Sequence, residues 1–195
     1  KTGEWLYLLQ DLAEDKSGLY KLSAKTGERQ KVYVDPNVDI SEVLFKAEGN
    51  GIYGLLVDDG YPAYILTDPA DPEAQVFKLL LQVFQGKKIS ITSQSNDGSK
   101  LVVAVSSDVM PQQFYLYDTA TSQLVTLFDN FNGIQPALIS PSKAIQFSAR
   151  DGTTIHGYFS RPQQVDPKQK VPMVTLVHGG PHGERDYWRY NREVQ

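Results

Sequence analysis

The sequence predicts a mainly β chain, built from repeated four-stranded sheets and ending in the truncated start of an α/β domain. Three observations predict this class. Short apolar runs recur with a period of about 40–50 residues. A stretch rich in Asn, Pro, Gly and Ser interrupts them after Phe128. A continuous apolar run at 171–177 then follows a hairpin signal. We therefore expect two domains, at 1–143 and 144–195.

The composition narrows the classes of function. The 195 residues carry 19 Lys and Arg against 23 Asp and Glu, for a net charge of −4, which is not the basic excess of a non-specific nucleic-acid binder. The chain has no cysteine, which excludes disulfide scaffolds and thiol nucleophiles and suits cytoplasm and bacterial periplasm alike. No apolar run approaches a membrane span. The chain begins at Lys1 rather than methionine, and we expect a fragment of a longer protein.

The repeated runs divide into three rounds of short strands. The strands are rich in β-branched residues and tyrosine, and polar turns follow the second strand of each round. The expected first strands are 5–9, 52–57 and 101–105, the second 19–22, 63–66 and 114–117, the third 31–34, 75–79 and 124–127, and the fourth 43–45 and 89–92.

Four short antiparallel strands per round are typical of a β-propeller blade. About three blades do not close a ring, so two sheet edges stay open, and we expect the fragment to self-associate through them. The alternative is a three-sheet sandwich whose period is accidental.

The second part begins with a connector and a hairpin. Residues 129–142 are loop-like, and apolar residues then alternate on both sides of Asp151-Gly152, a dipeptide that favours a tight turn. The run at 171–177 has the length and composition of a strand buried on both faces.

The motif after that run carries the chemistry. His178-Gly179-Gly180-Pro181 places a glycine loop at the carboxyl end of the expected strand, where α/β folds bind ligands. Bare glycine amides allow an anionic oxygen to approach closely. A lone His-Gly-Gly is more often an ordinary turn, but here a hairpin and a strand repeat precede it.

These features together resemble the prolyl oligopeptidase family of serine peptidases, most closely its acylaminoacyl-peptidase and dipeptidyl-aminopeptidase-like bacterial members. The stretch at 147–162 resembles the hairpin that opens the family's α/β-hydrolase domain, and 178–194 resembles the loop that enters its first helix. The resemblance implies hydrolysis of short peptides through an acyl-enzyme, without a cofactor, with the propeller gating substrate access.

The resemblance also implies roles for the loop. The Gly180 amide, next to Gly179, would contribute to the oxyanion hole. His178 stands where some relatives have a tyrosine that donates to the oxyanion, and we favour a loop-fixing role for it. Pro181 would rigidify the turn. Arg185 and Asp186 would pair to support the loop, or both would be solvated.

The catalytic triad is not in this chain. No Gly-x-Ser-x-Gly occurs, and in α/β-hydrolases the serine, acid and histidine all follow this loop. We therefore expect the fragment alone to be inactive. We expect His156 on the hairpin surface. His178 and His182 are four residues apart, but Gly-Gly-Pro between them excludes a helix and no third ligand is apparent, so we predict no metal site.

Two other functions stay open. An esterase-type α/β-hydrolase would have the same fold and loop. A non-enzymatic propeller module that binds a protein partner has no use for 145–195, and would be favoured if 171–177 completed a blade. We expect a short peptide as substrate of the parent, and no nucleic-acid or membrane partner.

Overall fold

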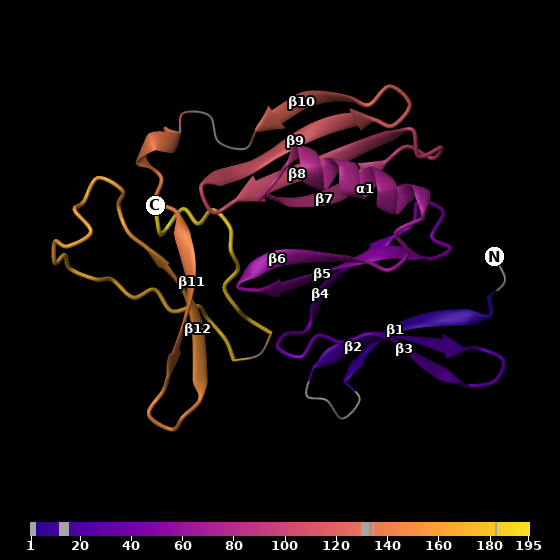
Figure 1. The fold of residues 1–195 in the computed structure, drawn as a ribbon, viewed down its shortest axis with the longest axis horizontal. Coiled ribbons are helices and arrows are strands. Elements are labelled where there is room, and N and C mark those ends of the chain that lie inside the picture. Colours follow the sequence, from indigo (N-terminus) through magenta and orange to yellow (C-terminus); the bar gives the residue numbers. More distant parts are fainter. Residues whose placement is uncertain (1–2, 12–15, 130–132, 134, 182) are drawn as a thin grey trace. The chain divides into compact units, whose positions relative to one another are not determined.

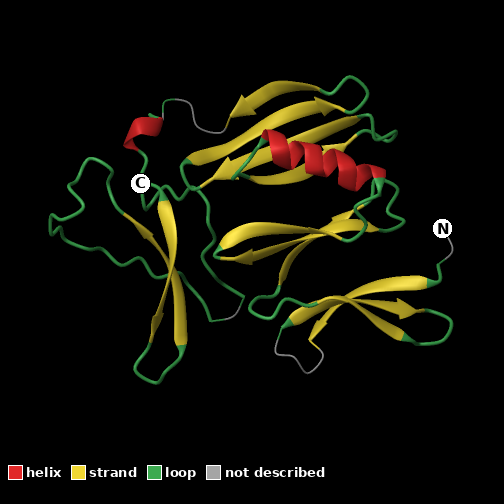
Figure 2. Ribbon diagram, viewed as in Figure 1, coloured by secondary structure: helices red, strands yellow, loops and turns green. Residues whose placement is uncertain are grey.

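The structure of the chain is a computed structural model that describes residues 3–11, 16–129, 133, 135–181 and 183–195. It is mainly β, with several small antiparallel sheets, one α-helix and one short 3-10 helix in the described residues (Figure 2). The chain divides into two compact units, Lys1–Val83 and Phe84–Gln195. Each unit is described by itself.

Two three-stranded sheets make up most of the first unit (Figure 1). One contains β1 (Trp5–Asp11), β2 (Ser17–Ser23) and β3 (Arg29–Tyr33), with β2 central. The other contains β4 (Ile40–Phe45), β5 (Ile52–Asp59) and β6 (Tyr61–Leu66), with β5 central. Asp59 pairs with Tyr61 across Gly60, whose φ of 77° suits a tight turn, so the Asp58-Asp59-Gly60 segment joins two strands.

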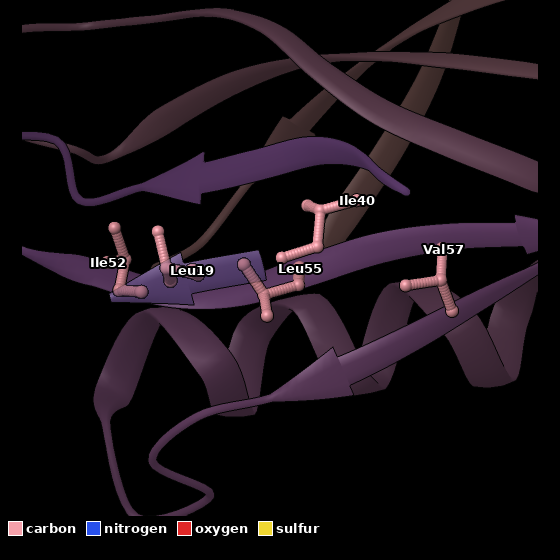
Figure 3. Close-up of a cluster of buried hydrophobic side chains, with 5 residues drawn as sticks. All are labelled: Leu19, Ile40, Ile52, Leu55 and Val57. Carbon is pink, nitrogen blue, oxygen red and sulfur yellow. The ribbon is translucent and has the colours of Figure 1, made fainter. Parts of the chain in front are cut away.

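The core of this unit gathers apolar side chains from both sheets (Figure 3). β5 is buried over almost its whole length, which identifies it as the central strand that is covered on both faces. Opposite β5, the register with β4 shifts between Leu44 and Phe45, and a bulge of this kind changes which side chains share a face. The cluster contains Leu19, Ile40, Ile52, Leu55 and Val57.

A helix occupies the segment in which we expected a third strand at 75–79, so that prediction is wrong. Helix α1 spans Pro72–Val83. Asp71 caps it by accepting hydrogen bonds from the amides of Glu73 (2.9 Å) and Ala74 (3.4 Å), and Pro72 stands at the first helical position, where its missing N–H costs nothing. Buried Ala74, Phe77 and Leu80 recur every three residues on one face.

Further contacts tie α1 to the loop between β4 and β5. Lys46 forms an ion pair with the buried Asp71, and the Ala47 amide donates to the Glu73 carboxylate at 2.9 Å. The Phe77 ring lies 5.7 Å from that of Tyr53 and 5.1 Å from that of Tyr64, so the helix packs on β5 and β6.

The second unit begins with a four-stranded antiparallel sheet in the order β10-β9-β8-β7 (Figure 1). Its strands are β7 (Lys88–Gln94), β8 (Lys100–Ser107), β9 (Met110–Asp118) and β10 (Gln123–Asp129). Ile89, Val103 and Val105 are fully buried. This sheet is a simple meander, in which each strand pairs with the next one along the chain.

The strands are grouped differently from the sequence prediction. Residues 43–45 belong to β4, which pairs with β5 rather than with the preceding sheet, and 89–92 belong to β7, which pairs with β8. Each run that we assigned as the last strand of one round therefore opens the next sheet. In the described residues only β7–β10 is a four-stranded sheet, whereas β1–β3 and β4–β6 have three strands each and β11–β12 has two.

The predicted hairpin is confirmed. β11 (Ser142–Ser148) pairs with β12 (Thr154–Ser160), and Gly152 adopts a φ of 87° in the turn between them. A 3-10 helix, η1 (Pro136–Leu138), precedes the hairpin. Among the described residues a helical membrane crossing is not found, since neither α1 nor η1 has the length and apolarity that it needs.

Candidate functional site

The segment that leads to the glycine loop is not a strand in this chain, contrary to our prediction for 171–177. These residues pair with neither β7–β10 nor β11–β12. Val174 is 91% exposed and Val177 is 79% exposed. The physical reason is that a strand needs a neighbouring strand to satisfy its backbone N–H and C=O groups, and no described strand lies in register with it. The segment also does not complete a blade, so the condition that would favour a non-enzymatic propeller is not met.

The glycine loop presents its backbone to solvent. Gly179 and Gly180 are exposed, and a Cβ atom on either would meet no heavy atom within 4 Å. The Gly180–Pro181 peptide bond is cis. Amides in such an open loop are accessible to an oxygen of a ligand, which is what an oxyanion donor requires.

The His178 side chain contacts its own loop. Its Nδ1 lies 2.6 Å from the carbonyl oxygen of Gly179, and because a carbonyl only accepts, Nδ1 is the donor in this contact. The imidazole is therefore engaged with the loop backbone, which is the geometry that a loop-fixing role needs. Whether this histidine has that role stays a prediction.

A group of cations surrounds Tyr187, a few residues after the loop. The guanidinium of Arg185 lies 4.9 Å from the ring centroid, that of Arg189 6.0 Å and the Lys88 ammonium 5.8 Å. Arg185 Nε also donates to the backbone carbonyl of Asp186 at 3.4 Å. Arg185 is thus held by the Tyr187 ring and by the backbone of Asp186, whose side chain is exposed. The predicted supporting pair of Arg185 and Asp186 stays a prediction.

The residues that follow are attached to the rest of the unit by hydrogen bonds. The Trp188 indole donates to the Ser142 carbonyl at 3.2 Å, and the Tyr190 amide donates to the Ser107 carbonyl at 2.8 Å. The side chain of Gln195 accepts from the Ser140 amide and donates to its carbonyl, both at 2.8 Å. Sequence reasoning missed these contacts, because nothing in the local pattern indicates which distant backbone groups a side chain will reach.

The sequence also led to predictions for the other two histidines, His156 and His182. His156 lies opposite Gln146 in the hairpin register, with its Nδ1 3.3 Å from the Gln146 amide nitrogen, and it is exposed, as predicted. His182 lies outside the described residues. In the described part of the chain, no group of three or more His, Cys, Asp or Glu residues could hold a metal ion.

Comparisons with known proteins give relatives of one kind. No protein-family model matches the chain. In an alignment 203 positions long, it is 25% identical to dipeptidyl aminopeptidase BIII of Pseudoxanthomonas mexicana. The alignment covers 97% of this chain and 29% of that protein. It is 30% identical over 99 residues to dipeptidyl-peptidase 5 of Schizosaccharomyces pombe, covering 49% of this chain and 14% of that protein.

A solved structure shares the fold. A puromycin-hydrolyzing peptidase of Mycobacterium tuberculosis superimposes with a TM-score of 0.52 at 17% identity, over 87% of this chain and 26% of that one. The chain thus spans less than a third of the length of each of these relatives.

Proposed function

Because this chain belongs to the prolyl oligopeptidase family of peptidases, we propose that it is part of a serine peptidase that hydrolyses short peptides through an acyl-enzyme. The observation that carries the proposal is the similarity to a dipeptidyl aminopeptidase along 97% of the chain. The open Gly179-Gly180 backbone supports it, because acyl transfer needs amide donors at the developing oxyanion.

In this proposal the chain contains the end of a β-propeller at 1–143 and the start of an α/β-hydrolase domain at 144–195. The meander β7–β10 has the strand order of a blade. The exposed apolar residues at 171–177 suit a strand that becomes buried once strands from the remainder of the parent protein pair with it. The propeller would limit access to the site to short peptides.

The chemistry would divide between this chain and the remainder of the parent. A serine hydroxyl there attacks the peptide carbonyl, and a histidine takes its proton and returns it to the leaving amine. The negative charge that develops on the carbonyl oxygen is stabilised by the Gly180 N–H and by the amide that follows the serine. His178 holds the loop through its contact with the Gly179 carbonyl. Water then releases the acyl group, and no cofactor takes part.

The amide of Gly180 can be tested in the whole parent protein with a matched pair of substitutions. Gly180→Ala keeps the N–H and fits the open space, whereas Gly180→Pro removes the N–H. We expect kcat on a peptide anilide to fall about 100–1,000-fold in Gly180→Pro and to change little in Gly180→Ala. An equal effect of both substitutions would refute the donor role.

Two further assays separate the alternatives. The 195-residue chain has no Gly-x-Ser-x-Gly serine, so a fluorophosphonate probe should leave it unlabelled, and covalent labelling would contradict this part of the proposal. If the whole protein turns over p-nitrophenyl esters but no peptide anilides, the esterase function replaces the peptidase.

A further inference from the structure

A buried aspartate lies at the turn between β8 and β9. Asp108 is 4% exposed, and its Oδ2 accepts a hydrogen bond from the Ser142 amide at 2.6 Å. A carboxylate withdrawn from water in this way needs strong donors. Asp108 therefore fixes the start of β11, a segment 34 residues away along the chain.

The peptide backbone of Ser142 carries the contact onward. Its carbonyl accepts from the indole Nε1 of Trp188 at 3.2 Å, while its amide is held by Asp108. The Ser142 hydroxyl lies 2.7 Å from that of Ser160 on β12. Both backbone groups of this one residue thus bind side chains from outside the hairpin, so displacing Asp108 displaces the acceptor of Trp188.

Two parallel contacts hold the same segment in place. The Tyr190 amide donates to the carbonyl of Ser107, the neighbour of Asp108, at 2.8 Å. Gln195 makes its two hydrogen bonds of 2.8 Å with Ser140. Trp188 is eight residues after Gly180, so the anchored segment begins shortly after the glycine loop.

We propose that Asp108 is a positioning residue, which acts through Ser142 and Trp188 to hold the segment behind the Gly179-Gly180 loop. This inference rests on the proposed function, since the position of the loop matters only if the Gly180 amide meets an oxyanion. Asp108 touches no reacting atom. Its effect is geometric, and a small misplacement of a catalytic donor lowers the rate strongly.

The contact itself can be tested in the 195-residue chain by amide hydrogen exchange. In Asp108→Asn we expect the Ser142 amide to exchange about 10–100-fold faster, because its hydrogen bond loses the charge of the acceptor. Asp151→Asn is the matched control. Asp151 also accepts a backbone hydrogen bond, from Thr153 at 2.9 Å, but in the exposed hairpin turn, so its substitution should leave Ser142 unchanged. Unchanged exchange of Ser142 in Asp108→Asn would overturn the inference.

The link to Trp188 has a spectroscopic readout. The chain contains two tryptophans, so in a Trp5→Phe background the emission reports Trp188 alone. Asp108→Asn should shift this emission to the red and make it easier to quench with acrylamide, and Asp151→Asn should do neither. If the Trp188 emission does not move, the contact ends at Ser142 and the proposal fails.

The catalytic consequence is tested in the whole protein by a double-substitution cycle. We expect kcat, per site titrated with a fluorophosphonate, to fall about 10–100-fold in Asp108→Asn and in Trp188→Phe, with KM nearly unchanged. The kcat of the double variant should fall no further than the kcat of the less active single variant, because both substitutions break the same chain of contacts. A purely structural role would reduce the number of titrated sites and leave the rate per site unchanged.

These experiments distinguish a failure of the positioning role from a failure of the proposed function. If Asp108→Asn does not fold, Trp188→Phe provides the same kinetic test, and normal turnover per site in it overturns the positioning role. If the unsubstituted whole protein cleaves neither peptides nor esters, the proposed function fails and the positioning role fails with it, whereas the exchange result still decides whether Asp108 holds Ser142.

Discussion

Phe77 is the side chain whose removal tests the packing of α1 most directly. It is fully buried, and its ring lies 5.7 Å from Tyr53 and 5.1 Å from Tyr64. Truncation of a buried phenylalanine to alanine costs about 3–5 kcal/mol, of which each aromatic pair contributes about 0.5–1.5 kcal/mol. Since small domains are stable by about 5–15 kcal/mol, Phe77→Ala should remove a large part of the stability of the first unit.

Hydrogen exchange resolved by peptide is the assay, because it reports the two units separately. In Phe77→Ala we expect α1, β5 and β6 to lose protection roughly 100-fold, as a loss of about 3 kcal/mol implies, while β7–β10 keeps its protection. Leu79→Ala is the matched control on the same helix. Leu79 is 50% exposed, so its truncation should change the free energy of unfolding by less than about 0.5 kcal/mol.

Equal effects of the two substitutions would contradict this packing, in which the apolar face of α1, and not the helix as a whole, contacts the sheet. If Phe77→Ala changed exchange no more than Leu79→Ala, α1 would not pack on β5 and β6 in solution. The strand that we predicted for this segment from its sequence would then have to be reconsidered.

Four further predictions concern stability and assembly. Gly54→Ala should cost about 1–3 kcal/mol in urea unfolding, because the new Cβ would lie 3.0 Å from a backbone carbonyl of β6, whereas Gly157→Ala, with its nearest neighbour at 3.9 Å, should cost little. Asp71→Ala should cost about 1–2 kcal/mol from the lost helix cap alone, and Asp71→Asn should recover part of this cost, which the same unfolding curves measure. The Lys100 ion pair, together with hydrogen bonds from the amides of Thr121 and Ala120, lowers the pKa of Asp118 to about 2; its stabilising effect is therefore complete above about pH 5 and lost as the pH falls towards 2, and an NMR titration should show the pKa of Asp118 rising in Lys100→Met. The 195-residue chain should self-associate through its open sheet edges, and a monodisperse monomer in light scattering at high concentration would contradict this.

Only the part of the candidate site that lies in one short stretch of sequence could be predicted. The His178-Gly179-Gly180-Pro181 motif can be read directly because glycine and proline restrict the backbone by themselves. The contacts that anchor the following segment could not be read, because Asp108 and Trp188 meet at Ser142 only after the chain has folded back on itself.

Features that depend only on neighbouring residues could be predicted from the sequence. Alternating apolar residues and Asp151-Gly152 specify the hairpin β11–β12, and short continuous apolar runs specify β5, β8 and β9. Helix α1 could also have been predicted from the sequence, since Asp71-Pro72 is a helix-start signal and the buried residues follow a helical period.

The pairing of the strands, by contrast, depends on contacts between distant parts of the chain. β4 joins β5 rather than the preceding sheet, and the apolar run at 171–177 remains exposed. The physical reason is that side-chain alternation fixes only which face of a strand is apolar. The hydrogen-bonding edges of a strand are the same for every sequence, so the choice of partner depends on which other strands are present and how their faces pack.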